Sequence, residues 1–284
     1  MLCRVMGFPK SSLYYRESVS RRPPSPAEVE NERIKERIKA IHRDSLGTYG
    51  SPRITAALRR EGELVNQKRV RRLMAEAGVV GITRRRAGRS KAATIAAAAR
   101  EARVANDLVH RDFAADAPDR LWFADITEHP TDEGKLYLAS VLDAFDKSIV
   151  GWSMGENATT TLVVNAVEMA ITRRQPVIAP VHHSDRGTQY TSLEFSDRLT
   201  TLGLTPSMGS RGDAYDNAVI ESWHATLQTE LFDRQQWRTR DELKTAVFYF
   251  IEVFYNRRRL HSSLGYHSPS EHGRGYAQTP AVGS

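Results

Sequence analysis

Three acidic side chains have the types and positions that metal-ion chemistry requires. Asp125 lies within WFADIT, where Phe123 and Ile126 indicate a buried strand. Asp185 follows the apolar run VIAPV and two histidines, and 35 residues separate it from Glu221. If the first and fourth strands of a mixed sheet are neighbours, the two aspartates lie side by side and repel each other. A divalent cation relieves that repulsion, so these acids are candidate metal ligands.

The ligand chemistry favours a hard cation. Three carboxylates without a cysteine or histidine cluster predict Mg²⁺ or Mn²⁺ rather than zinc. His182 and His183 are adjacent on a strand, so they point to opposite faces and at most one lies near the site. Two ions about 3.5–4 Å apart would activate a nucleophile and stabilise the leaving oxygen of a phosphodiester. We therefore expect two ions per site, held by Asp125, Asp185 and Glu221.

Each acid also has an ordinary structural explanation. An aspartate near a strand end often caps a turn, and a helical glutamate is often simply solvated. The other acids of this region are assigned to turns or, for the last of them, to a helix start: Asp143, Asp146, Asp213 and Asp216.

The pattern from residue 119 onward predicts a scaffold for these acids. Three strand-like segments come first, separated by hairpin-sized breaks: RLWFADITEHP, KLYLASVLDAF and SIVGWSMG. Two helix-like segments then alternate with two further strands: TLVVNAVEMAITRR, PVIAPVHHS, SLEFSDRLTTLG and LTPSM. The order predicts an α/β fold, in which a mixed five-stranded sheet is flanked by helices.

Two more helices are expected after a polar loop, GSRGDAYDN. The first, AVIESWHATLQTELF, carries Glu221 and buries a stripe that includes Trp223 and Leu231. The second opens with a capping box formed by Thr239 and Glu242.

The N-terminal part of the chain is basic. Residues 1–118 contain 25 Lys and Arg against 13 Asp and Glu, whereas residues 119–284 contain 16 against 21. A polyanionic partner explains this asymmetry, and a solvated surface explains the charge about equally well.

Three short helices are expected in that basic part, with a tight break before the third. Pro52 suits the first turn of the second helix, Gly62 closes it, and Asn66 caps the third. This arrangement resembles a helix-turn-helix, whose third helix would present its cations outside an apolar stripe. A basic, solvated helical hairpin is the alternative.

Cysteine usage and hydropathy limit the class of protein. Cys3 is the one cysteine, so no intrachain disulfide forms and a reducing compartment is expected. No run approaches the roughly 18 apolar residues of a membrane helix, and the N-terminus lacks the apolar core of a signal peptide. We therefore expect a cytoplasmic protein without a membrane partner.

Five fragments in order resemble the OrfB transposases of the IS-three group of insertion sequences: WFADIT, VLDAF…IVGWSM, HHSDRGTQYTS, SMGSRGDAYDNAVIESW and YNRRRLHSSLGYHSP. The resemblance covers about residues 30–270. It implies an RNase H-like integrase core after an all-α helix-turn-helix domain, with an Asp-Asp-Glu triad at Asp125, Asp185 and Glu221. The implied chemistry is metal-dependent cleavage at the element ends, after which the released 3′-hydroxyl attacks another phosphodiester.

The resemblance also implies partners. These are double-stranded DNA (the terminal inverted repeats and the target), an OrfA protein or OrfA–OrfB fusion, and further copies of the chain on DNA. Gln228 stands where relatives usually carry lysine, which replaces a charge with hydrogen bonds. The expected DNA contacts are Lys68, Arg69, Arg71, Arg72, Arg84, Arg85, Arg86, Asn217, His224, Gln228, Arg257 and Arg258.

The domain boundaries follow from these patterns. We expect an N-terminal segment and linker (1–26), a helix-turn-helix domain (27–83), a basic, Ala-rich helical connector (84–113), a catalytic core (114–273) and a tail (274–284). Two other functions fit the same residues: a DNA-binding regulator of transposition without catalysis, or another RNase H-like nuclease. The helix-turn-helix argues against a nuclease that recognises DNA by shape alone.

Overall fold

The computed structural model describes residues 22–82, 115–185, 187–208 and 218–278. The chain forms two compact units, one up to Gly81 and one from Ile82 onward, and each is described by itself. Several expected contacts and acids lie outside the described residues: Arg84, Arg85, Arg86, Asn217, Asp213 and Asp216. The expected connector, 84–113, also lies outside them.

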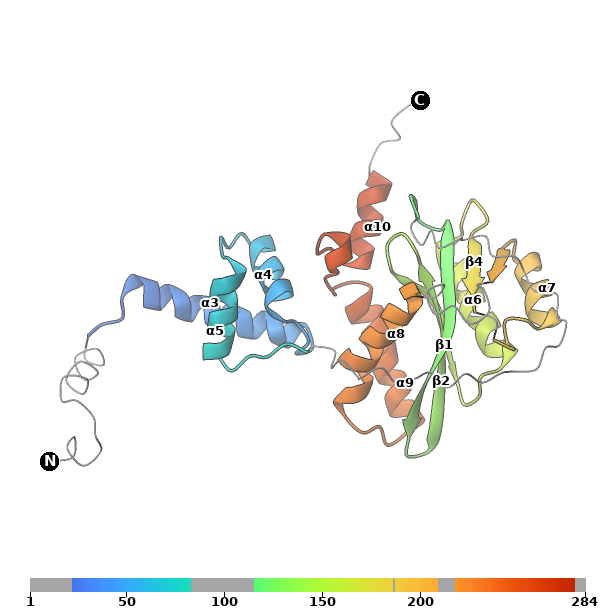
Figure 1. The fold of residues 1–284 in the computed structure, drawn as a ribbon, viewed down its shortest axis with the longest axis horizontal. Helices are drawn as coiled ribbons and strands as arrows, with labels where there is room; N and C mark the ends of the chain where they lie inside the picture. Colours follow the sequence, from blue (N-terminus) through green and yellow to red (C-terminus); the bar gives the residue numbers. More distant parts are fainter. Residues whose placement is uncertain (1–21, 83–114, 186, 209–217, 279–284) are drawn as a thin grey trace, which may run out of the picture. The chain divides into compact units, whose positions relative to one another are not determined.

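The N-terminal unit is a bundle of three helices (Figure 1): α3 (Pro26–Asp44), α4 (Ser51–Arg60) and α5 (Gln67–Glu76). Ser25 caps α3 through a capping box with Glu28, and Asn66 caps α5 by accepting the Arg69 N–H. Gly62 and Gly78 have φ values of +88° and +67°, which glycine adopts without strain.

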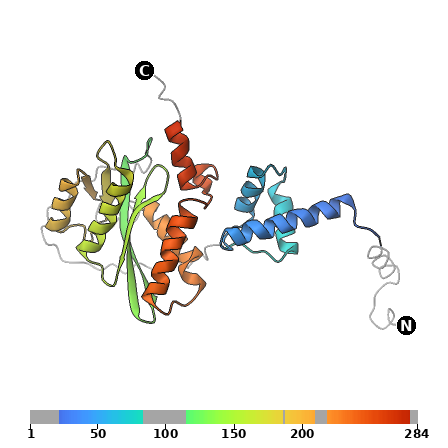
Figure 2. The same ribbon diagram turned by 180° about the vertical axis from the view of Figure 1, so that it is seen from behind.

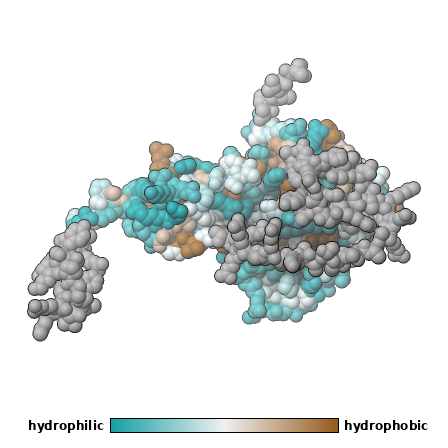
Figure 3. Space-filling model, viewed as in Figure 1, coloured by the Kyte–Doolittle hydropathy of each residue, from teal (hydrophilic) through white to brown (hydrophobic). Residues whose placement is uncertain are grey.

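The core of this unit comes from one stripe on each helix. It is formed by Ile34, Ile38, Ile41, Ile54, Leu58, Val70, Leu73 and Met74. The viewer's side of α3 to α5 is mostly hydrophilic in Figure 3, interrupted by small apolar areas. Leu64 and Val80 are exposed hydrophobic side chains of this unit. The expected three helices, with a short break before the third, are confirmed.

The second unit is built on a five-stranded mixed sheet. Its strands are β1 (Leu121–Thr131), β2 (Gly134–Asp143), β3 (Ile149–Gly155), β4 (Val181–Ser184) and β5 (Thr205–Met208). Their order in the sheet is β3-β2-β1-β4-β5. β1, β2 and β3 are antiparallel neighbours, whereas β4 runs parallel to β1 and β5 parallel to β4. The predicted adjacency of the first and fourth strands is therefore confirmed.

Helices cover both faces of the sheet (Figures 1 and 2). α6 (Thr160–Arg174) and α7 (Leu193–Thr201) lie on one face, and α8 (Ala218–Glu230) and α9 (Arg240–Tyr249) lie on the other. α6 approaches β3 so closely that a Cβ on Gly151 would lie 2.0 Å from the Ala166 carbonyl oxygen. That contact admits only glycine.

The C-terminal part departs from the expected pattern. α9 continues as a π-helical segment, η2 (Phe250–Tyr255), and the last helix, α10 (Pro269–Gln278), runs across the boundary expected at residue 273. Two short 3₁₀ segments, η1 (Phe232–Arg234) and η3 (Ser262–Leu264), join these helices. Leu231, expected on the buried stripe of α8, lies just beyond its end. Over the described residues, no helix combines the length and apolar character of a membrane span.

Candidate active site

Asp125 lies on β1, the central strand of the sheet. Its Oδ1 accepts the Ile126 N–H at 2.8 Å, and its side chain is 23% exposed. In the antiparallel pairing of β1 with β2 it stands directly opposite Ser140, so the two side chains share a face of the sheet. The strand therefore fixes the carboxylate at the base of a partly open site.

Asp185 follows β4, the parallel neighbour of β1. Because Ala124 is paired with Ser184, the next residues along the two strands, Asp125 and Asp185, are level with each other. Asp185 Oδ1 accepts the Gly187 N–H at 2.9 Å. The residue is exposed overall, yet burial of its carboxylate raises its pKa, and the negative charge of Asp125 raises it further. The structure thus brings the two aspartates together.

Glu221 lies in the first turn of α8 and is exposed. One turn further along the helix, His224 places Nδ1 3.5 Å from Asp125 Oδ2. Because Glu221 is one turn from His224 on the same helix, this contact brings the turn that carries Glu221 toward the aspartates. Over the residues that the structure describes, however, no three His, Cys, Asp or Glu side chains form a closed metal-binding cluster. The two aspartates lie level on neighbouring strands, and Glu221 forms no such cluster with them in the described residues.

Three buried polar atoms around the aspartates have no hydrogen-bond partner within the described parts of the chain. They are Ser140 Oγ, on the strand opposite Asp125, His224 Nε2, on the ring that contacts it, and the hydroxyl of Tyr190. Burial raises the pKa of Tyr190, and the charges of Asp125 and Asp185 raise it further. Buried polar atoms are normally satisfied, so such atoms indicate space for a bound group or water. Two adjacent carboxylates, one with a raised pKa, are stabilised by a divalent cation. These residues fit Mg²⁺ or Mn²⁺.

Family comparisons match both units of the chain. Residues 29–87 match a family described as HTH-like domain, and residues 115–214 and 202–269 match two families described as Integrase core domain. The transposase for insertion sequence element IS904 of Lactococcus lactis is 37% identical over 250 residues, covering 88% of this chain and 97% of the relative. The chain belongs to the insertion-sequence transposases.

Further relatives agree. The putative transposase for IS986/IS6110 of Mycobacterium tuberculosis is 39% identical over 273 residues, covering 92% of this chain and 95% of the relative. The transposase for IS629 of Shigella sonnei is 37% identical over 268 residues, covering 93% of this chain and 88% of the relative. The transposase chain therefore combines an HTH-like domain with an integrase core of the polynucleotidyl transferase type.

The solved structures to which this chain is similar include chains of retroviral origin. A chain of the simian T-cell lymphotropic virus intasome, in complex with PP2A regulatory subunit B56 gamma, is 13% identical with a TM-score of 0.49, covering 87% of this chain and 76% of that one. The HTLV-2 integrase catalytic core in complex with magnesium is 17% identical with a TM-score of 0.42, and the match covers 55% of this chain and 97% of that one.

The two histidines before Asp185 face opposite sides of the sheet, as expected. His182 packs edge-on against Phe195, and burial lowers its pKa to about 4. His183 lies on the other side, where its Nδ1 is 2.9 Å from Ser207 Oγ. His182 is thus a neutral residue of the transposase core.

The cations expected to contact DNA are not equivalent. On α5, Lys68, Arg71 and Arg72 are exposed, whereas Arg69 is half-buried. The guanidinium of Arg69 donates two hydrogen bonds to Asn31 Oδ1 on α3, at 2.8 and 3.2 Å. Arg72 also lies 3.6 Å from Glu76 one turn along α5, and Arg69 links two helices.

The C-terminal candidates also differ from one another. Gln228, expected to contact DNA, donates its side-chain amide to Asp233. Arg257 and Arg258 are exposed at the end of η2. His224, also expected as a DNA contact, has its Nδ1 3.5 Å from Asp125 Oδ2.

Neither Ser140, opposite Asp125, nor the ion pair at the end of α8 was expected from the sequence. Ser140 lies opposite Asp125 because of the register between β2 and β1, which the sequence does not specify. Glu230, at the end of α8, forms a buried ion pair with Arg259, whose side chain is 4% exposed. No local signal marks this pair, since Arg259 follows two other arginines and Glu230 follows a threonine.

Proposed function

We propose that Asp125, Asp185 and Glu221 hold divalent ions and catalyse cleavage and strand transfer at the ends of an insertion sequence. The observation that carries this proposal is the pair of aspartates on neighbouring parallel strands, in register and close enough for Asp125 to raise the pKa of Asp185. A protein that only binds DNA has no need for two mutually repelling carboxylates beside buried, unpartnered polar atoms.

Bound Mg²⁺ or Mn²⁺, two per site, would stabilise the attacking and leaving oxygens of the phosphodiester. The residues of the chain orient the ligand oxygens. The N–H groups of Ile126 and Gly187 each fix one oxygen of an aspartate, and His224 contacts the free oxygen of Asp125. α8 supplies Glu221 from the adjacent turn.

The finer assignments are proposals as well. The order of the five fragments supports an OrfB-type transposase of the IS-three group, which acts with an OrfA protein or as an OrfA–OrfB fusion. Its substrate is double-stranded DNA, and joining two ends requires more than one copy of the chain. We also propose the segments 1–26, 27–83, 84–113, 114–273 and 274–284 as its domain organisation.

The proposed DNA contacts divide by position. The contacts on α5 suit a helix that enters a DNA groove. The remaining residues would contact the DNA backbone near the catalytic core. The proposed contacts are Lys68, Arg71, Arg72, Arg84, Arg85, Arg86, Asn217, Arg257 and Arg258, with weaker contributions from Arg69, His224 and Gln228.

The test uses purified protein, labelled duplexes that carry the element ends, and Mg²⁺ or Mn²⁺. We expect metal-dependent nicked and joined products from the wild type and none from Asp185→Asn, with DNA binding retained. The matched control is Asp197→Asn, since Asp197 is exposed on α7 and makes the same change of charge. Full activity of Asp185→Asn would exclude the triad. Specific binding without products, even after addition of OrfA, would favour a regulator.

A further inference from the structure

A cavity of about 600 Å³ opens at the start of β3, on the edge of the sheet opposite β5. Its lining comes from α6, the beginning of β3, η2 and α10. None of the three candidate catalytic acids lines it. The cavity is therefore separate from the candidate active site.

The lining of this cavity carries a net positive charge. Four arginines face two acidic residues: Arg173, Arg174, Arg257 and Arg274 against Asp146 and Glu252. Two of the arginines are neutralised within the cavity, since Arg174 pairs with Asp146 at 2.7 Å and Arg173 with Glu252 at 2.7 Å. The other two come from separate elements and are exposed. Within the described residues, Arg257 and Arg274 have no carboxylate partner.

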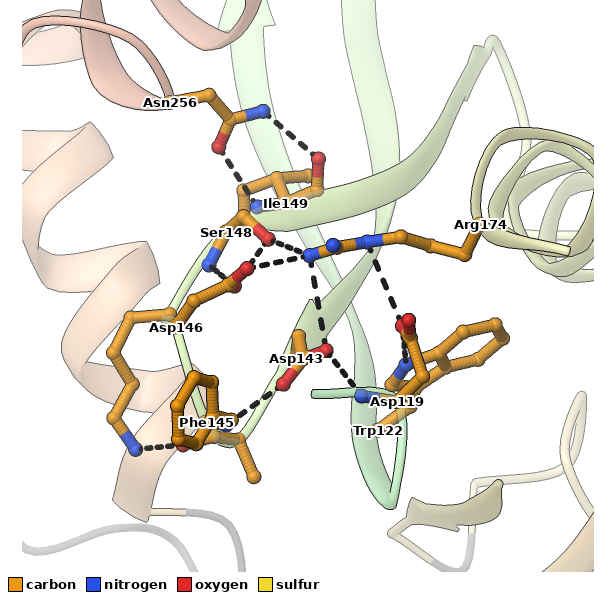
Figure 4. A network of polar contacts seen from close by, with 11 residues as sticks. Asp119, Trp122, Asp143, Phe145, Asp146, Ser148, Ile149, Arg174 and Asn256 are labelled. Carbon is orange, nitrogen blue, oxygen red and sulfur yellow. Dashed lines mark hydrogen bonds and ion pairs between the residues drawn. The ribbon is translucent and has the colours of Figure 1, made fainter. Parts of the chain in front are cut away.

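A network of polar contacts joins residues in the floor of the cavity (Figure 4). Arg174 lies among three carboxylates, 2.7 Å from Asp146, 3.5 Å from Asp119 and 3.7 Å from Asp143. It also donates to Ser148 Oγ at 2.6 Å. A network of this density holds its members in one geometry.

The backbone that carries the two unpaired arginines is held against this floor. The side-chain amide of Asn256 bonds both the N–H and the carbonyl oxygen of Ile149, at 2.9 Å each, which fixes the chain just before Arg257. α10 lies directly on the floor, because a Cβ on Gly273 would be 2.9 Å from Asp146 Oδ2. Arg274 follows that contact. Both guanidiniums therefore project from anchored backbone.

We propose that this cavity binds a backbone phosphate of the DNA substrate, outside the active site. Guanidinium groups match the oxygens of a phosphodiester, and the hydroxyl of Ser270, which also lines the cavity, adds a neutral donor. The site binds phosphate without reading bases, and so it positions the duplex. This inference rests on the proposed function, because it takes DNA as the ligand.

The strand geometry gives the approximate distance between the cavity and the active site, and so the separation of the two contacts along a duplex. Two strand spacings of about 4.8 Å separate β3 from β1, and the turn at Asp146 lies roughly 10–15 Å along the strands from Asp125. The cavity is thus about 15 Å from the active site, or roughly four to five base pairs of duplex at 3.4 Å each. A straight duplex that spans the two sites would place the contacted phosphate at about that separation from the scissile bond.

The test is the salt dependence of duplex binding by the full chain in EDTA. We expect Arg257→Gln/Arg274→Gln to reduce the slope of log K against log[salt] by about 0.9, since the two arginines contact one phosphate and each phosphate contact contributes about 0.9. The matched control is Arg120→Gln/Arg238→Gln, which removes two exposed arginines from the same unit. An unchanged slope, or an equal loss in the control, would overturn the proposal.

A second arm separates DNA from free phosphate. A methylphosphonate placed four to five base pairs from the scissile bond should weaken binding by the wild type and leave binding by the double variant unchanged. If inorganic phosphate binds the cavity while neither duplex experiment responds, the ligand is not DNA. Because these measurements need no metal and no cleavage, they are independent of the Asp185→Asn test. A reduced slope together with an active Asp185→Asn variant would refute the triad and leave the phosphate site intact.

Discussion

The ion pair between Arg259 and Glu230 gives the sharpest test of how the catalytic helix is held. Arg259 donates to both carboxylate oxygens, at 2.7 and 2.6 Å, and the two side chains are 4% and 8% exposed. Glu230 ends α8, the helix that carries Glu221. Arg259→Met would leave a buried carboxylate without its counterion. Breaking a buried pair in this way costs about 3–5 kcal/mol, a large share of the roughly 5–15 kcal/mol that stabilises a typical protein.

Removing both charges should be far less damaging than removing one. In Arg259→Met/Glu230→Leu no charge stays buried, and replacing a buried pair by apolar side chains is often neutral. The Arg259 guanidinium also lies 3.2 Å from His261 Nε2 and 5.6 Å from the centre of the Tyr255 ring, so part of the loss will remain. We expect the double variant to recover at least half of the free energy of unfolding that Arg259→Met loses.

The assay is urea unfolding of the four proteins of this cycle, with hydrogen exchange of α8 measured alongside. The control is Arg198→Met, because Arg198 pairs with Glu168 on the surface, where the side chains are 44% and 37% exposed. An exposed pair contributes at most about 1 kcal/mol. If Arg259→Met costs no more than Arg198→Met, or leaves the protection of the α8 amides unchanged, then the pair does not anchor α8.

Three other predictions concern the sheet that supports the site. Asn256→Ala should destabilise the protein by about 1–3 kcal/mol, measured by urea unfolding, because the N–H and carbonyl oxygen of Ile149 both lose a partner on an edge strand. Gly151→Ala should lower the melting temperature, since the new Cβ meets the Ala166 carbonyl oxygen at 2.0 Å; an unchanged melting temperature would contradict this packing. Burial, and then a neighbouring carboxylate, raise the pKa of Asp143 from 3.8 to about 7. The folded state then binds a proton more readily than the unfolded state, so the stability contributed by this group falls as pH rises from about 4 to 7. Asp143→Asn should flatten that decline in a pH series of unfolding curves.

Much of the fold could be predicted because short-range patterns determine it. The alternation and apolar content of residues 121–155 specify three antiparallel strands. The fourth strand was expected over the apolar run VIAPV, but β4 takes only Val181 from it, and Val177 and Ile178 are exposed. An acid at the end of that fourth strand falls beside Asp125 only if β4 pairs with β1, which was an assumption about topology. The structure confirms it: the chain passes from β3 through α6 to β4, which pairs with β1 and not with β3.

The parts that could not be predicted depend on contacts between distant residues. Glu230 and Arg259 are 29 residues apart, and nothing local to either one predicts the other. The π-helical turn Phe250–Tyr255 has the same periodic apolar side chains as an α-helix, so the pattern does not distinguish them. The Arg69 contact with Asn31 likewise joins two helices through side chains that sequence patterns treat as exposed.

The three candidate ligands are held by different kinds of structure, and this difference predicts how the site responds to change. Asp125 and Asp185 are held on their strands by strand pairing and by bonds to backbone N–H groups, and α8 adds the His224 contact to Asp125. The position of Glu221 depends entirely on how α8 is held. Trp223 anchors that helix, with its ring centroid 4.4 Å from that of Tyr255, and the ion pair of Glu230 anchors its other end. Variants that loosen α8 should therefore move Glu221 and His224 while the two aspartates stay on their strands. Their catalytic rate should fall while the electrostatic coupling between Asp125 and Asp185 persists.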